Sequence, residues 1–156
     1  LAAGNDPTRA SVLGWIMNRM GFPPRSIPLL KQAVERAEDD ELREESTFTL
    51  FESYLDTQAW KQAEQTFPQA AKRLTAKELP DWYARVAVAA AQAGAGTDAM
   101  RIWRRVANLS PYHVNGLKEL AEAGLQEELT AFYREMRSQM PASGAPARAL
   151  QCLGHQ

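Results

Sequence analysis

Apolar residues recur along this chain at spacings of three and four, the period that places them on one face of an α-helix. The first stripe lies between Asp6-Pro7, an N-cap residue followed by a proline suited to the first helical turn, and Gly21, a C-terminal stop. We therefore expect an amphipathic helix over residues 8–20. Its apolar stripe consists of Val12, Leu13, Ile16, Met17 and Met20.

Prolines and glycines divide the rest of the chain into further helices. Pro23 and Pro24 cannot continue the first helix but fit the start of a second, so residues 8–37 predict a tight helical hairpin. The same arrangement returns three times, with turns near Gln58, Gly94 and Gly124. In the last hairpin we expect the first helix to begin at Tyr112. No segment alternates with period two for long enough to predict a strand, so the predicted fold class is all-α.

The four turns align as an internal repeat. Spacings of 37, 36 and 30 residues separate the turn residues, which are Gly21, Gln58, Gly94 and Gly124. Five residues after each turn stand Ser26, Ala63, Ala99 and Leu129, and four residues later stand Leu30, Phe67, Trp103 and Tyr133. Three residues further on stand Ala33, Ala70, Val106 and Met136. A large residue between two smaller ones, repeated in register, is a packing pattern for paired helices.

These positions resemble the tetratricopeptide repeat (TPR) family, whose 34-residue unit is a pair of antiparallel helices with small residues where the helices cross. The matching residues are Leu13, Gly14, Met17, Gly21, Ser26, Leu30 and Ala33 in the first repeat, Tyr54, Ala63, Phe67 and Ala70 in the second, and Tyr83, Ala87, Gly94, Ala99, Trp103 and Pro111 in the third. The fourth repeat retains Gly124, Tyr133 and Pro141. The resemblance implies a right-handed α-α superhelix, or solenoid, of about four antiparallel helix pairs.

The resemblance also implies the domain boundaries. We expect an N-terminal extension at 1–6 and a TPR-like domain at 7–141, with repeats at about 7–40, 41–79, 80–111 and 112–141. Phe51 stands where the family prefers a small residue, and Pro68 falls inside a helix, so the second repeat is expected to be locally irregular. The tail at 142–156 is rich in Pro, Ala and Gly, and either ends in a short capping helix near 148–153 or is disordered.

Composition excludes several classes of partner. The 18 Lys and Arg residues are balanced by 19 Asp and Glu, so the net charge is −1 and nucleic acid is not an expected partner. The longest apolar run, residues 86–91, is too short to span a membrane, and the single cysteine, Cys152, cannot form a disulfide within the chain. The compartment stays open, and we expect the chain, which begins at Leu1, to be part of a larger protein.

No group of residues predicts catalysis or a bound cofactor. The two histidines, His113 and His155, have no spacing to cysteine or carboxylates that forms a metal-ligand set, and we interpret His113 as a surface or capping residue. The chain also lacks a nucleophile elbow and a Gly-rich phosphate loop. We therefore expect no enzymatic activity, no metal and no cofactor.

Two charged segments are interpreted as solvated helix faces or turns. One is the set of arginines at three-to-four spacing, Arg101, Arg104 and Arg105. The other is the acidic run at 35–45, where docking of a basic partner is the alternative.

Stacked helical hairpins create a concave surface that holds a peptide or a partner domain. In the TPR family the first helix of each pair lines this groove, which implies the contact residues Ser11, Trp15, Asn18, Arg19, Glu45, Phe48, Glu52, Asp56, Ala84, Val88, Ala91 and Gln92. Trp15 and Glu52 stand where chaperone-binding members carry asparagines, so no clamp for a terminal carboxylate is expected. Aromatic residues beside carboxylates instead suit a protein or peptide segment with an apolar anchor and basic residues.

Two alternatives accompany this interpretation. The helical repeats could serve as a structural, oligomerising or regulatory segment of a larger protein rather than as a recognition module. Trp15, the residue we expect to contribute most to binding, could instead cover the exposed end of the first repeat.

Overall fold

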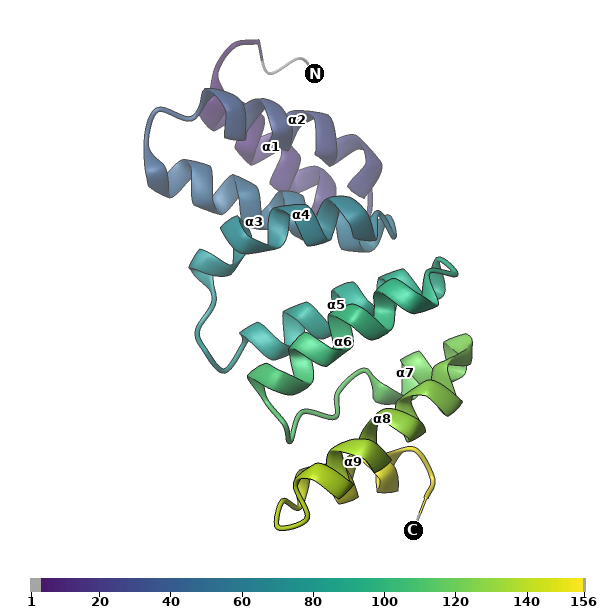
Figure 1. Cartoon of the computed structure of the whole chain (residues 1–156). Coiled ribbons are helices and arrows are strands. Elements are labelled where there is room, and N and C mark those ends of the chain that lie inside the picture. The colour runs from purple at the N-terminus through teal and green to yellow at the C-terminus, as the bar shows by residue number, and fades with distance from the viewer. Residues whose placement is uncertain (1–3, 156) are drawn as a thin grey trace. The chain divides into compact units, whose positions relative to one another are not determined.

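The computed structural model describes residues 4–155, and the regular elements in that range are all helical (Figure 1). The α-helices are α1 (Pro7–Arg19), α2 (Pro23–Arg36), α3 (Asp40–Asp56), α4 (Trp60–Ala70), α5 (Leu79–Gln92), α6 (Gly96–Leu109), α7 (Leu117–Leu120), α8 (Gln126–Gln139) and α9 (Ala145–Cys152). A 3-10 turn, η1 (Ala71–Arg73), follows α4, and a π-helical segment, η2 (Ala121–Leu125), joins α7 to α8. The predicted all-α class is confirmed for these residues.

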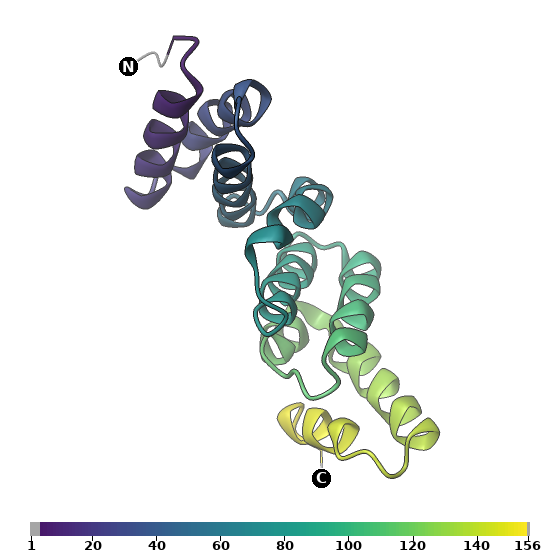
Figure 2. The same cartoon turned by 90° about the vertical axis from the view of Figure 1, so that its left-hand side faces the viewer.

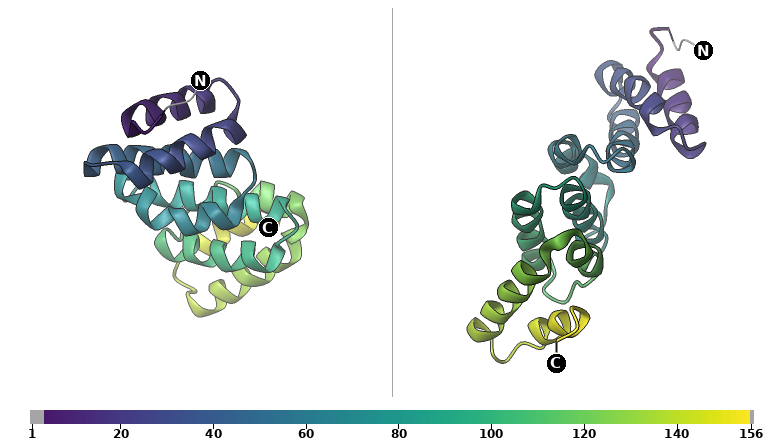
Figure 3. Two further views of the ribbon diagram at one scale, coloured as in Figure 1. Left: turned by 90° about the horizontal axis from the view of Figure 1, so that it is seen from above. Right: turned by 90° about the vertical axis from the view of Figure 1, so that its right-hand side faces the viewer.

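The chain divides into two compact units, Leu1–Thr75 and Ala76–Gln156, and each is described by itself. In the first, unit 1, every helix packs on the next, and α1 also packs on α3, so that α1, α2 and α3 lie side by side (Figure 2). In the second, unit 2, α5 packs on α6 and on α7. The tail of unit 2 forms α9, which folds back beside α8 (Figure 3, right).

The turns predicted from the repeat lie where helices reverse direction. Gly21, Gln58, Gly94 and Gly124 all have positive φ, at 83°, 57°, 80° and 100° respectively. In the first three turns, the amide of the following residue donates to a carbonyl five residues earlier, at 2.8, 2.8 and 2.9 Å. This bond satisfies a carbonyl that the helix end would otherwise leave unpaired. Gln58 adopts this positive φ although its β-carbon disfavours that conformation, which glycine adopts freely.

The residues aligned after each turn form much of the core. All twelve are buried except Phe67 and Met136, which are half-buried. In unit 1, Gly14 of α1 faces Leu30 of α2 so closely that a β-carbon at Gly14 would lie 2.6 Å from Leu30 Cγ. In unit 2, the indole Nε1–H of Trp103 donates to the hydroxyl of Tyr133 at 2.9 Å, and both side chains are fully buried. Small residues therefore permit close helix pairs, and large ones fill the space between them.

The pattern of the fourth hairpin predicts a first helix about a turn shorter than in the other repeats, and in the structure this helix is shorter still. It begins at Leu117 rather than Tyr112, because Gly116 adopts a left-handed conformation with φ of 98° that a continuous helix cannot contain. A β-carbon at Gly116 would lie 3.3 Å from Val88 and 3.6 Å from Trp103, so the backbone here packs directly on α5 and α6.

Part of the apolar stripe predicted for α1 faces the core, where Leu13 packs on Ala10 and Ala33 and Met17 is half-buried, but the rest does not. The buried residues of α1 are Ala10, Ser11, Gly14 and Asn18, whereas Val12 is 52% and Met20 is 65% exposed. Ile16, between them on the same arc of the helix, is half-buried. The close approach to α2 at Gly14 centres the buried face of α1 on small side chains, so the arc with Val12 and Met20 is left outside.

Candidate interaction surface

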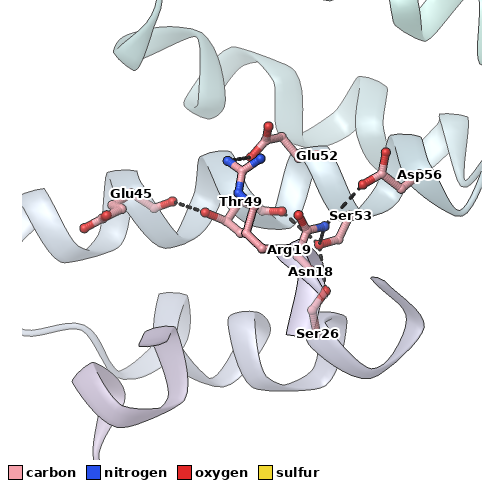
Figure 4. Close-up of polar contacts among 8 residues, drawn as sticks. All are labelled: Asn18, Arg19, Ser26, Glu45, Thr49, Glu52, Ser53 and Asp56. Atoms are coloured by element: carbon pink, nitrogen blue, oxygen red, sulfur yellow. Dashed lines mark hydrogen bonds and ion pairs between the residues drawn. The ribbon is translucent and has the colours of Figure 1, made fainter. Parts of the chain in front are cut away.

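In unit 1 the structure brings together the predicted groove residues of α1 and α3. We call their solvent-facing set the α1–α3 surface, and its members are Trp15, Arg19, Glu45, Phe48, Glu52 and Asp56. Helical spacing explains the set on α3, because residues 45, 48, 52 and 56 recur every three or four positions and share one face. Figure 4 shows the α1–α3 contact beneath them.

Two predicted groove residues, Ser11 and Asn18, are buried in the contact between α1 and α3 rather than exposed. The Ser46 hydroxyl donates to Ser11 Oγ at 2.8 Å. Asn18 Nδ2 donates to Ser53 Oγ at 2.9 Å and to Asp56 Oδ2 at 3.3 Å (Figure 4). These bonds satisfy polar groups that would otherwise be buried without partners, so Ser11 and Asn18 hold the two helices in register.

A serine of α2 completes this buried polar contact. Ser26 Oγ and Ser53 Oγ lie 2.7 Å apart and share a hydrogen bond. Each hydroxyl has one proton, so one serine donates to the other, which in turn donates to a carbonyl of its own helix: Ser26 Oγ lies 2.7 Å from the carbonyl oxygen of Pro23, and Ser53 Oγ lies 3.0 Å from that of Thr49. We did not single out Ser53 from the sequence, although its seven-residue spacing from Ser46 places both on the same side of α3.

Above this contact, Arg19 links the aromatic and acidic parts of the α1–α3 surface. Its guanidinium carbon lies 5.8 Å from the centre of the Trp15 ring, within the range of a cation–π interaction. One of its nitrogens lies 3.5 Å from a carboxylate oxygen of Glu52, whose side chain is mostly buried (Figure 4). Trp15 itself is 46% exposed. The arrangement places an indole ring, partly open to solvent, beside the Arg19–Glu52 ion pair.

The α3 part of the surface is apolar in the middle and acidic around it. Phe48 is half-buried, with its ring centre 6.2 Å from that of Phe51 in the core. Glu45 lies one turn before Phe48 and is exposed, and Asp56 is exposed at the end of α3. Apart from Arg19, the charged members of the α1–α3 surface are therefore carboxylates.

The predicted groove residues of α5 belong to unit 2, and most of them are not exposed. Ala84 and Ala91 are buried, and Val88 is half-buried against Gly116. Gln92 is exposed and lines a shallow pocket of about 460 Å³. The other residues of that pocket are Ala91, Gly94, Glu119, Glu122 and Ala123. This pocket is also acidic, although Glu122 lies 3.8 Å from Lys118.

The interpretation of His113 as a surface residue is wrong. Its side chain is only 9% exposed, its ring centre lies 6.0 Å from that of Trp103, and Nε2 lies 3.6 Å from a carboxylate oxygen of Asp81. The left-handed turn at Gly116 draws this segment onto the core instead of extending a helix into solvent. Asn115 Nδ2 donates to the same Asp81 oxygen at 2.9 Å.

The titratable side chains of the described residues form no metal-binding cluster. Within residues 4–155, no three His, Cys, Asp or Glu side chains are placed to hold a metal ion together. Burial raises the pKa of the Tyr133 hydroxyl to about 12, and the hydrogen bond from Trp103 opposes part of that rise. Tyr133 is enclosed by the core, so this shift reflects packing rather than a reactive site.

None of the helices described is both long enough and apolar enough to cross a bilayer. Comparison of the chain with protein-family models, with curated proteins and with solved structures gave no match.

Proposed function

We propose that this chain is a protein-interaction module, a TPR-like helical solenoid whose α1–α3 surface binds an extended segment of a partner protein. The observation that carries this proposal is the exposed Trp15 ring, held by Arg19 beside a row of carboxylates on α3. Aromatic side chains in such positions contribute much of the binding energy at protein interfaces, since they bury a large area with little loss of conformational freedom.

The charge of the surface favours one class of partner. Glu45 and Asp56 are exposed on the same face of α3 as Phe48, and Glu52 on that face forms an ion pair with Arg19. A segment with an apolar anchor for Trp15 and Phe48 and with Lys or Arg beside it would complement both properties. Charges at the rim of an interface mainly set orientation and association rate, so the anchor is expected to dominate affinity.

The solenoid part of the proposal is supported by the local geometry of each unit. Left-handed turns recur at the four predicted positions, three of them with the same backbone hydrogen bond, and small residues are buried where the helices pack. Such hairpins stack on their neighbours in helical-repeat proteins and present an elongated binding face. The pocket beside Gln92, lined by Glu119 and Glu122, would offer a second acidic contact within unit 2.

The proposal is tested with a random peptide library displayed on phage and selected on the whole chain. We expect the selected peptides to share an apolar residue flanked by Lys or Arg. In fluorescence polarisation with synthetic versions, Trp15→Ala and Glu45→Lys should each weaken binding at least about tenfold, or about 1.4 kcal/mol.

Two variants in unit 2 serve as matched controls. Tyr112→Ala removes another exposed aromatic ring, and Glu127→Lys makes the same charge reversal at another exposed position. Both should leave the affinity unchanged. If the selected peptides bind the Trp15 and Glu45 variants as tightly as the parent chain, the α1–α3 surface is not the binding site.

A further inference from the structure

The outward arc of α1 carries three large apolar side chains, two of which the fold of unit 1 leaves more than half exposed to solvent. Val12, Ile16 and Met20 are spaced four residues apart and so form a ridge along the helix, about 12 Å long at 1.5 Å per residue. Val12 and Met20 are more than half exposed, and Ile16 is half-buried. A helix of a globular domain ordinarily buries its large apolar residues, so the exposure of Val12 and Met20 makes this ridge a candidate interaction surface.

The surface continues past the end of the helix. Phe22, in the turn after α1, is 44% exposed, and the guanidinium carbon of Arg25 lies 5.6 Å from the centre of its ring. We call this set the outer face of α1, and its members are Arg9, Val12, Ile16, Met20, Phe22 and Arg25. It differs from the α1–α3 surface, because the ridge and Trp15 occupy neighbouring but distinct arcs of the helix.

The charge on the outer face has one sign. Residues 7–34 contain Arg9, Arg19, Arg25 and Lys31 and no Asp or Glu. Arg9 falls on the same arc as Val12 and Ile16, three and seven residues away. Arg19 is paired with Glu52, whereas neither Arg9 nor Arg25 lies within ion-pair distance of a carboxylate in the described part of the chain. The ridge therefore has a cationic group near each end.

We propose that the outer face of α1 docks an acidic amphipathic helix of a partner protein. The partner's apolar residues would pack at three-to-four spacing along Val12, Ile16 and Met20, since a straight ridge of this kind fits the groove of a second helix. Asp or Glu residues flanking that stripe would face Arg9 and Arg25. A second copy of this chain fits less well, because a symmetric contact would bring the same arginines together across the interface.

This interaction is separate from the proposed binding of a basic segment to the α1–α3 surface, and it does not depend on that proposal. Unit 1 would then offer two surfaces of opposite charge preference on adjacent arcs of one helix. Substitutions distinguish the two surfaces. Met20 and Ile16 lie outside the α1–α3 surface, and Phe48 and Glu45 lie outside the outer face.

The probes are two synthetic helical peptides of about four turns with the same stripe of leucines. One carries glutamates beside the stripe and the other carries lysines. Each is titrated into the whole chain with labelled Ile, Leu, Val and Met methyl groups and followed by NMR. We expect the glutamate peptide to shift the Val12, Ile16 and Met20 methyl signals and to bind at least tenfold more tightly than the lysine peptide.

Charge reversal and truncation give the decisive comparisons. Arg9→Glu combined with Arg25→Glu should reverse the preference between the two peptides. Met20→Ser should lower the affinity for the glutamate peptide at least fivefold. The control, Arg104→Glu combined with Arg148→Glu, makes the same charge change in unit 2 and should leave the preference intact. Circular dichroism checks that each variant is folded, which these exposed positions favour.

Three results would overturn the proposal. The first is equal affinity for the two peptides, or no binding of either at millimolar concentration. The second is a set of shifts centred on Phe48 rather than on Ile16 and Met20. The third is a concentration-dependent dimer in sedimentation equilibrium that Met20→Ser abolishes, which would assign the outer face to a second copy of the chain.

Discussion

Replacing Tyr133 with phenylalanine removes a single oxygen atom from the core of unit 2. That oxygen accepts the indole Nε1–H of Trp103 at 2.9 Å, and both side chains are fully buried. In the Tyr133→Phe variant the indole N–H stays buried with no acceptor from Tyr133. Leaving a buried donor unsatisfied costs about 1–3 kcal/mol, so we expect the free energy of unfolding to fall by that amount at neutral pH.

The same tyrosine makes stability depend on pH. Burial raises the pKa of Tyr133 to about 12, against a reference value of 10.0. Above pH 10 the unfolded chain releases the tyrosine proton while the folded chain keeps it, so this contribution is complete below pH 10 and is lost as the pH rises towards about 12. Each pH unit in that window removes about 1.4 kcal/mol, or about 2.7 kcal/mol in all.

Urea denaturation of both proteins at pH 8 and at pH 11.5, followed by circular dichroism, separates the two effects. The phenylalanine variant should be the less stable protein at pH 8. At pH 11.5 the difference should shrink by about 2 kcal/mol, because only the parent chain carries the Tyr133 titration. Other tyrosines and lysines titrate in both proteins and cancel in the difference.

The matched control is Tyr112→Phe, at an exposed tyrosine of unit 2, which should leave stability unchanged at pH 8. A Tyr133→Phe variant as stable as the parent at pH 8 would show that the Trp103 hydrogen bond contributes nothing. A difference that stays constant between the two pH values would show that the Tyr133 pKa is not raised.

Three further substitutions test the fold by urea unfolding. Gln58→Gly should stabilise unit 1 by about 0.5–1 kcal/mol, because the native φ of 57° is left-handed and costs glycine little; a loss of stability would contradict that strain. Gly14→Ala should destabilise by about 1–3 kcal/mol, since the new methyl group would lie 2.6 Å from Leu30 Cγ; a neutral effect would show that the α1–α2 contact is loose. His113→Ala should cost about 1–2 kcal/mol through lost packing on Trp103, whereas a surface histidine would cost almost nothing.

The turns of this fold could be predicted from the sequence because their causes are local. A helix that must reverse needs a residue tolerant of positive φ, and Gly21, Gly94 and Gly124 supply it. The start of α7 could not be predicted in this way. Its position depends on Gly116 packing against Val88 and Trp103, which are distant in the sequence. This tertiary contact delays the start of the helix to Leu117, although the helical pattern of the sequence begins at Tyr112.

The sequence predicts which helices form the candidate surface, but it does not predict which of their residues are buried. Spacing alone places Glu45, Phe48 and Glu52 on one face of α3, and the structure has them there. Ser11 and Asn18 share helical spacing with exposed positions, yet they are buried because serines on α3 lie opposite them. A pattern within one helix cannot reveal the partner across a contact.

The orientation of α1 follows from a competition between the size of its side chains and their polarity. Polarity alone would turn Val12, Ile16 and Met20 inward. The arc containing Ala10 and Gly14 allows α2 to approach much more closely, and Ser11 and Asn18 lose little by burial because Ser46 and Ser53 satisfy them. Close packing over the length of the helix therefore outweighs full burial of these three side chains, which are left exposed or half-buried beside Arg9 and Arg25. If the partner helix we propose covers them, a Met20→Ser change should weaken binding while leaving the stability of the isolated chain almost unchanged, whereas a core residue would lose both.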